Sequence, residues 1–382
     1  MSQYTIYQIS QTKPTLLEKF GLYYLQFFKK NDSDHNVFNL SDNELANRVN
    51  KITLKGIVLS SIVGITCVYP TVWVDVFFAK HSNLVHYSWL AATTIMSIAI
   101  ELYLLFLISL KAVYQVSEIV NIHASQKDLE QDGLFSVKNI LARTALELPD
   151  PELKIIGIDP FKRISKKNLL ILGLLYKAKI FVTNVIVKYA LIFFIGKTIF
   201  GVSVLYEAIL VECFWNSVVI RKVVLEARLR LFGFALANKI GQNILNNNIL
   251  NQLSVNARIG CIRAIGNAVV LAQNYHPNMI LLLVKFQQIL KINESNKYDD
   301  FEIFLETLKT VSKSERFFLL DLFTIAAAFD GKLSVLEKQN LKTVYENDYE
   351  IYLPRLTRLT SNLTQGKLHA AMADCSLDFE TG

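Results

Sequence analysis

Two long stretches of the chain contain almost no side chains that require water. Residues 56–74 carry no charge, and residues 87–110 are interrupted only by Glu101. A helix needs about 20 apolar residues to cross a hydrocarbon layer of about 30 Å, whereas apolar runs in soluble proteins usually stop at about 10 to 14 residues. The pattern therefore predicts two membrane-spanning helices, about 53–78 and 87–111. The alternative is a set of buried helices in a large soluble α-protein.

A third apolar stretch, residues 180–220, is about twice as long as one span. Near its middle are three residues suited to a tight connection, Gly196, Lys197 and Gly201. We therefore expect two further helices, about 178–196 and 202–221. Charges embedded in this pair weaken its membrane signal, so the soluble alternative is stronger here than for the first pair.

Basic residues are sorted around these four helices. They precede the first helix (Arg48, Lys51 and Lys55), recur throughout residues 111–179 and follow residue 220, while the other two connections hold only Lys80 and Lys197. Positive residues stay on the cytoplasmic side of a membrane. The sorting predicts two hairpins in the cytoplasmic (plasma or inner) membrane, with both termini and the loop 112–177 in the cytoplasm. It also accounts for the net charge of +7 without a nucleic-acid partner.

The N-terminal segment 1–50 contains an amphipathic pattern at residues 14–30. Such a helix either lies on the membrane surface or packs against the protein's own cytosolic helices, and the sequence leaves both open. Ser41 and Glu44 have the spacing of a capping box, in which each side chain hydrogen-bonds the backbone at the other residue. We expect a helix to begin there and lead into the first span.

The central loop 112–177 contains three prolines that end helices, and a short amphipathic helix is expected before them at about 134–147. Four basic residues follow the prolines: Lys162, Arg163, Lys166 and Lys167. They either contact anionic lipid headgroups or only enforce the topology.

The chain after residue 221 has the periodicity of helices and no pattern typical of strands. We divide it into cytosolic helices at 222–292 and, beyond the polar linker 293–300, a helical domain at 300–382. Two capping boxes, Ser312 with Glu315 and Ser334 with Glu337, each begin an apolar-periodic run.

Residues 317–346 contain an alanine-rich helix, an Asp-Gly pair, a short turn and a glutamate in the next helix. These elements are Ala326, Ala327, Ala328, Asp330, Gly331, Leu333, Ser334 and Glu337. The stretch resembles the TerB-like module of the tellurite-resistance type. That resemblance implies an all-helical bundle, sometimes with an acidic metal-binding face.

The chain departs from that acidic face. Asp321 and Asp330 are nine positions apart on one predicted helix, which puts them on opposite sides of it, and Glu337 is occupied by capping. Asp330 and Glu337 are therefore weak candidates for metal ligands, and we predict no metal site.

Motifs that carry catalytic chemistry are missing from the sequence. The four cysteines show no paired spacing, the six histidines include no H-x-x-x-H, and the 15 glycines form no phosphate loop. This pattern excludes a disulfide scaffold and a structural zinc site, and it gives no support to metallohydrolase or serine-hydrolase chemistry. We expect a non-enzymatic protein without a cofactor.

Four ionisable residues fall inside the predicted spans: Glu101, Lys188, Glu207 and Glu212. A turn near residue 199 would bring Lys188 to the depth of the two glutamates on the following helix. Charges in a membrane are costly, so they pair, face a cavity or lose their charge. The cluster is either a structural pair that fixes helix register or part of an ion path.

These patterns predict an all-α integral membrane protein with four transmembrane helices and a cytosolic helical region. The expected function is that of a membrane-anchored adaptor or sensor, with the lipid bilayer and a protein as partners. The alternative is a small ion or proton channel or transporter. Four helices rarely enclose a pore, so the alternative requires a homo-oligomer.

Overall fold

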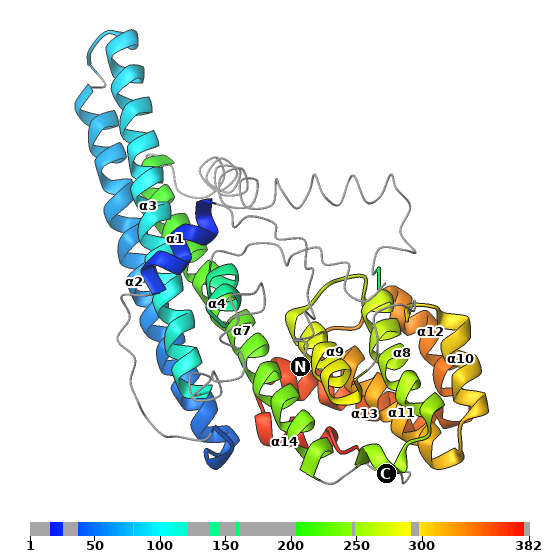
Figure 1. The fold of residues 1–382 in the computed structure, drawn as a ribbon. Coiled ribbons are helices and arrows are strands. Elements are labelled where there is room, and N and C mark those ends of the chain that lie inside the picture. Colours follow the sequence, from blue (N-terminus) through cyan, green and yellow to red (C-terminus); the bar gives the residue numbers. More distant parts are fainter. Residues whose placement is uncertain are drawn as a thin grey trace, which may run out of the picture.

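The computed structural model describes residues 16–25, 37–78, 80–120, 137–145, 158–159, 204–246, 249–291 and 298–377. Within these ranges the fold is all-helical and contains no strand, as predicted. Figure 1 shows a slender group of long helices and a cluster of shorter ones. We call the first group, α2, α3 and residues 204–221 of α7, the three-helix bundle. The second, residues 222–377, is the helical domain.

The first two bundle helices form an antiparallel pair, α2 (Asp42–Phe78) and α3 (Asn83–Val120). The predicted capping box begins α2: the Ser41 amide donates to Glu44 Oε2 at 2.9 Å and the Glu44 amide donates to Ser41 Oγ at 3.3 Å. From this cap α2 runs without a break through the apolar stretch, as expected.

Helix α3 is longer than the predicted 87–111. Residues 112–120 had been assigned to the loop, but they are helical because Val113, Val116 and Val120 continue its buried apolar face. The third bundle helix belongs to α7 (Val204–Asn246), whose 43 residues span about 64 Å at a rise of about 1.5 Å per residue. Its first half packs on α2 and α3, and its second half packs on α9 and α13.

Three of the described helices are long and apolar enough to cross a membrane: α2, α3 and α8 (Val255–Ala272). They differ in where their apolar surface lies. Only 11% of the apolar window of α3 is buried within the protein, against 72% for α8, which lies inside the helical domain. The predicted span 178–196 lies outside the described residues. The one predicted at 202–221 corresponds to the start of α7, which is not one of these three helices.

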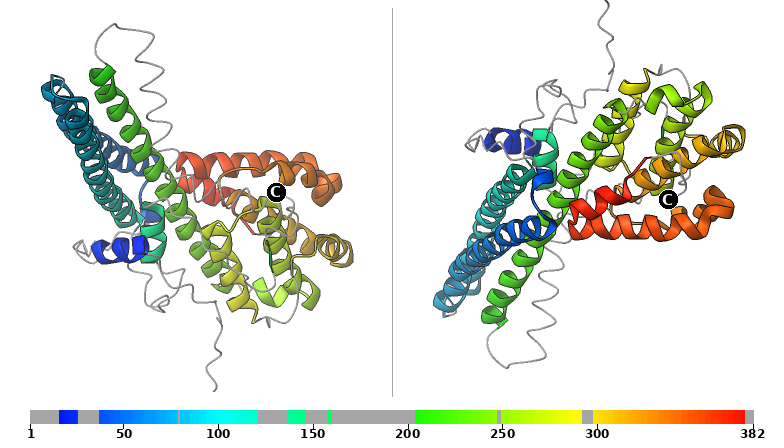
Figure 2. Two further views of the ribbon diagram at one scale, coloured as in Figure 1. Left: turned by 90° about the horizontal axis from the view of Figure 1, so that it is seen from above. Right: turned by 90° about the horizontal axis from the view of Figure 1, so that it is seen from below.

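The helical domain surrounds α11 (Lys313–Ala328), which is buried from Phe317 to Ala328. Both predicted capping boxes, at Ser312 and Ser334, are present. The remaining elements, seen from two further directions in Figure 2, are α9 (Pro277–Leu290), α10 (Phe301–Thr310), α12 (Val335–Tyr345), α13 (Tyr349–Gln365) and α14 (Leu368–Asp374), with short 3₁₀ helices η4 (Ile249–Gln252) and η5 (Glu346–Asp348).

Two short helices lie beside α3: α1 (Leu16–Leu25) and α4 (Val137–Ala145), each close to its predicted position. The hydroxyl groups of Tyr24 on α1 and Tyr103 on α3 are 2.7 Å apart. Helix α1 thus packs on α4, in the predicted cytosolic loop, and on α3 within the predicted span 87–111. The placement of this segment on a membrane surface stays a prediction. The 3₁₀ helix η1 (Val37–Asn39) precedes α2.

Candidate functional site

Helix α2 presents a row of small residues to α7. Gly56, Ser60 and Gly64 are spaced four positions apart and are all buried. A Cβ atom on Gly56 would lie 2.7 Å from Ile220 Cγ2, and one on Gly64 would lie 2.9 Å from the Asn216 amide nitrogen. Small residues at this spacing allow two helices to approach closely. The pattern is readable in the sequence, but our sequence analysis did not use it.

A buried hydrogen bond joins α3 to α7 at the level of these small residues. Asn216 Nδ2 donates to Glu101 Oε1 at 2.7 Å and lies 3.4 Å from the carbonyl oxygen of Ser60 on α2. Glu101 is 5% exposed and Asn216 is 1% exposed. All three helices therefore meet at one polar point, which we call the Glu101–Asn216 site.

Glu212 lies one helical turn before Asn216 and is also buried. The structure thus brings two of the four predicted ionisable residues, Glu101 and Glu212, toward the same interior face. Lys188 lies outside the described residues, and so does the side chain of Glu207. Asn216 was missed because the search considered only ionisable groups; the signal was an asparagine inside an apolar run.

The Glu101–Asn216 site is far from the nearest basic residue that follows it on α3. Glu101 precedes Lys111 by ten positions, which corresponds to about 15 Å along α3. A carboxyl group in apolar surroundings is stable only when it is hydrogen-bonded or neutral. The amide of Asn216 supplies one donor and fixes the register of α3 against α7. The arrangement can hold a carboxylate or a carboxylic acid in place.

The far end of the bundle is rich in aromatic rings. Trp73 stacks on Phe77 at 4.9 Å between ring centroids, and Phe78 stacks on Trp89 at 5.8 Å. Next to them His86 Nε2 is 2.8 Å from Asp75 Oδ1, which connects α3 to α2 near their turn. Both tryptophans are exposed, as expected for rings at a membrane interface.

A second group of ionisable residues lies where α7 enters the helical domain; Arg230 and His276 are buried and Glu226 is partly exposed. Glu226 Oε1 lies 2.7 Å from Arg230 Nε and 3.9 Å from His276 Nε2. Partial burial opposes the charge on Glu226, but the nearby His276 and the hydrogen-bonded guanidinium group of Arg230 outweigh it and lower the pKa of Glu226 well below its usual range. The sequence does not reveal this group because His276, just before α9, is distant in sequence from Glu226 and Arg230 on α7.

The two weak metal candidates are buried close to this group. Burial and the nearby charge of Asp330 raise the pKa of Glu337 to about 8, and burial raises the pKa of Asp330 as well. Asp330 accepts hydrogen bonds from Asn274 Nδ2 at 2.9 Å and from the Lys332 amide at 3.1 Å. Glu337 accepts one from the Ser334 amide at 2.6 Å, as its capping role requires.

One assumption about these carboxylates was wrong. Asp330 does not share a helix with Asp321, because α11 ends at Ala328 and Gly331 turns the chain with a φ of 74°. Asp321 instead pairs with Arg355. Among the described residues no three His, Cys, Asp or Glu side chains are arranged to hold a metal ion.

Comparison of the chain with protein-family models, curated proteins and solved structures found no match. The predicted headgroup contacts Lys162, Arg163, Lys166 and Lys167 lie outside the described residues.

Proposed function

We propose that the chain is a membrane-anchored, non-enzymatic adaptor or sensor. The three-helix bundle, with the segment around 178–196 as its fourth span, crosses the membrane, and the helical domain binds a partner protein in the cytoplasm. The observation that carries the proposal is the continuity of α7, which passes unbroken from the bundle into the core of the helical domain.

The surface of the bundle supports its place in a membrane. Large apolar side chains are exposed along α2 and α3, among them Val58, Ile62, Ile65, Ile95, Met96 and Ile100. In water this much apolar surface would be unfavourable, at about 25 cal/mol per Å² left uncovered. The polar groups of the bundle, Glu101 and Asn216, are buried inside it.

The junction between α7 and the helical domain is built from specific contacts. Asn278 Nδ2 lies 3.0 Å from the carbonyl oxygen of Leu229 on α7 and 3.2 Å from that of Phe329 after α11. Arg228 on α7 donates to the carbonyl group of Thr364 on α13. These bonds make the second half of α7 an integral helix of the domain, so the domain is held in one orientation relative to the bundle.

A second connection joins α2 to α14. The carboxylate of Asp42 accepts hydrogen bonds from the amides of His369, at 2.9 Å, and Ala370, at 3.3 Å. His369 Nε2 also lies 2.6 Å from the carbonyl oxygen of Leu40. Two helices of the bundle thus contact the domain, which favours a sensor that transmits a change of helix arrangement over a passive tether.

Cysteine labelling tests the proposed orientation. In a background without the four native cysteines, a membrane-impermeant reagent added to intact cells should label Ser82→Cys, at the exposed turn between α2 and α3, and should miss Glu302→Cys on α10. Labelling of Glu302→Cys from outside would contradict the topology.

Purification from detergent-solubilised membranes tests the adaptor role. A protein that copurifies with the full chain at fixed stoichiometry, and is lost when surface residues of the helical domain are changed, would support it. The ion or proton conductor is favoured instead if the purified homo-oligomer carries flux in liposomes without any other protein. The TerB-like resemblance stays a prediction in either case.

A further inference from the structure

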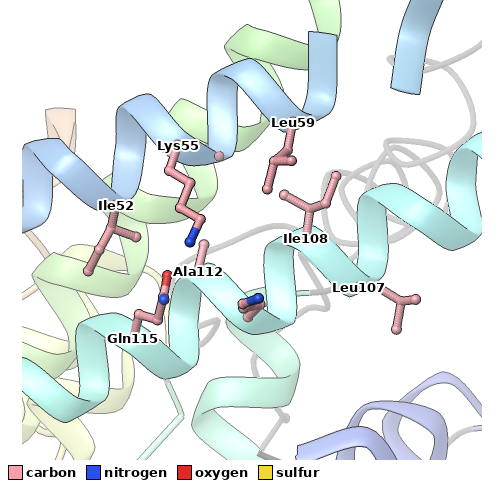
Figure 3. A pocket seen from close by; sticks show the side chains of 9 residues that line it. Ile52, Lys55, Leu59, Leu107, Ile108, Ala112 and Gln115 are labelled. Atoms are coloured by element: carbon pink, nitrogen blue, oxygen red, sulfur yellow. The ribbon is translucent and has the colours of Figure 1, made fainter. Parts of the chain in front are cut away.

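A hollow of about 210 Å³ lies between α2 and α3, at the end of the bundle nearest the helical domain. Figure 3 shows it from close by, with side chains from both helices around it. Two small residues, Gly56 and Ala112, contribute to its lining and leave room between the helices. The other lining residues are Ile52, Lys55, Leu59, Leu107, Ile108, Lys111 and Gln115.

The polar part of this lining favours an anion. Lys55 comes from α2 and Lys111 from α3, and the nine lining residues include no Asp or Glu. Gln115 adds an amide that can donate to an oxygen, and in Figure 3 the Lys55 side chain points toward it. Two ammonium groups with an amide donor match the charge and hydrogen-bonding capacity of a phosphate group.

The charged and the apolar residues of the lining are separated along the bundle axis. On each helix the residue four positions from the lysine, toward the middle of the bundle, is a leucine: Leu59 on α2 and Leu107 on α3. Exposed apolar side chains, including Val58 and Ile62, continue in that direction. A ligand in this hollow would therefore have its charge at the bundle end and its apolar part along the helices.

We infer that this hollow binds the phosphate headgroup of an anionic phospholipid, with the acyl chains lying along α2 and α3. The inference rests on the proposed placement of the bundle in a membrane, where Lys55 and Lys111 fall at the cytoplasmic boundary. Basic pockets between transmembrane helices on that side are suited to anionic headgroups. Free phosphate would satisfy the lysines but leave the leucine layer uncovered.

Native mass spectrometry of the full chain in a neutral detergent tests the site. Wild-type protein is titrated with phosphatidylglycerol and, separately, with phosphatidylcholine; we expect one tightly held phosphatidylglycerol per chain and weaker phosphatidylcholine binding. In Lys55→Gln/Lys111→Gln the affinity for phosphatidylglycerol should fall about thirtyfold, or roughly 2 kcal/mol at about 1.4 kcal/mol per tenfold. Both lysines are exposed, so the substitution should leave the fold intact.

The matched control is Lys51→Gln/Arg221→Gln, which removes two exposed basic residues at the same boundary but outside the hollow. The affinity of this control variant for phosphatidylglycerol should change by less than about threefold. In a neutral detergent there is no charged lipid surface that basic residues outside the hollow could attract. An equal loss in both double variants would overturn the site, since diffuse charge would then explain binding. Conservative Lys55→Arg/Lys111→Arg should retain the lipid.

Two further measurements are needed. One distinguishes a lipid headgroup from free phosphate, and the other distinguishes failure of this inference from failure of the proposed membrane placement. Inorganic phosphate at millimolar concentration should not displace the lipid; displacement would assign the hollow to a free anion and overturn the lipid proposal. Wild-type protein that fails to incorporate into phosphatidylcholine vesicles would overturn the membrane placement and this inference with it. Incorporation without phosphatidylglycerol binding would overturn the inference alone.

Discussion

Helices α3 and α8 meet the same criteria of length and apolar composition, yet they have opposite environments. The apolar window of α3 is 11% buried within the protein, and that of α8 is 72% buried. Around α8 the other helices of the domain cover its apolar side chains, whereas α1, α2, α4 and α7 together leave most of the apolar window of α3 exposed. Composition thus shows that a helix avoids water, and only the packing shows whether protein covers it.

The distribution of polar groups also differs between the two regions. In the three-helix bundle the buried contact that specifies the packing is polar, the Glu101–Asn216 site, while the outside is apolar. In the helical domain the interior is filled with leucine, phenylalanine and alanine, and single polar groups are buried both at helix ends, such as Glu337, and within helices, such as Asp321. Variants in each region should therefore fail for different reasons.

The chain offers separate probes for the two regions. All three tryptophans, Trp73, Trp89 and Trp215, are in the bundle, so their fluorescence follows its unfolding. Cys261 is buried on α8, so its reaction with a thiol reagent follows opening of the helical domain. The predictions below that concern the stability of one region use these probes on the full chain in detergent.

The largest effect is expected for Gly233→Ala in the helical domain. A Cβ atom there would lie 2.0 Å from Asn278 Nδ2, so Asn278 must move and lose its bonds to Leu229 and Phe329. We expect a loss of about 3–5 kcal/mol in the free energy of unfolding, seen first as faster labelling of Cys261.

Gly241→Ala on the same helix is the control. Its Cβ atom would meet Ile289 Cδ1 at an ordinary 3.7 Å, so the higher helix propensity of alanine should stabilise the chain by about 0.5–1 kcal/mol. If both variants destabilise equally, close packing at Gly233 is not the cause.

The next effect concerns pH. Burial and Asp330 raise the pKa of Glu337 from 4.5 to about 8, so between these values the folded chain keeps a proton that the unfolded chain has lost. The stability of the helical domain should therefore fall as pH rises from about 4.5 to about 8. Glu337→Gln preserves the capping acceptor and should remove this fall, leaving the domain about 2–4 kcal/mol more stable at pH 9 than wild type.

Exposed Glu306→Gln on α10 is the matched change. It should leave the pH dependence of Cys261 labelling unaltered, and an equal effect of both substitutions would refute the assignment to Glu337.

A smaller effect is expected for Asn216→Leu in the bundle. The substitution removes the amide donor from the buried carboxyl group of Glu101, at a cost of about 1–3 kcal/mol. Tryptophan fluorescence should show earlier unfolding while Cys261 labelling changes little. Glu101→Leu/Asn216→Leu should recover most of the loss, because apolar packing replaces the polar pair.

The same double variant separates a structural site from an ion path. If the bundle conducts ions or protons through Glu101, the folded double variant should carry no flux in liposomes where wild type does. Flux that survives in the double variant would exclude a path through this site.

The smallest effect concerns the contact between the two regions. Asp42→Ala removes the acceptor for the amides of His369 and Ala370 and should cost about 1 kcal/mol, while Asp42→Asn keeps one acceptor and should cost less. Hydrogen exchange at the amides of His369 and Ala370 measures directly how strongly this contact protects them. Unchanged protection of both amides in Asp42→Ala would show that this contact does not form in solution.

Much of the fold could be predicted from the sequence because its helices are locally encoded. Ser41, Ser312 and Ser334 each cap a helix where the pattern predicted one, and Gly331 ends α11 with a positive φ. The extension of α3 through residues 112–120 could not be predicted, since it depends on burial against distant helices.

The candidate site was only half predicted. Glu101 was found because a charge interrupts an apolar run, but its partner Asn216 is 115 positions away and is not ionisable. No local rule connects two such residues; only the packing of α3 on α7 does so. The group around Glu226 and His276 was missed for the same reason, because it forms where separate helices meet.

Because α7 is one unbroken helix, a small tilt at one end produces a larger displacement along its length. A helix of about 64 Å is stiff, so a tilt of about 5° at its N-terminal end would move its other end sideways by about 6 Å. Because Asn278 and Arg228 attach α7 near its middle to α9, α11 and α13, the whole domain would have to move with it. A displacement too small to alter the Glu101–Asn216 contact would then be amplified at the domain surface.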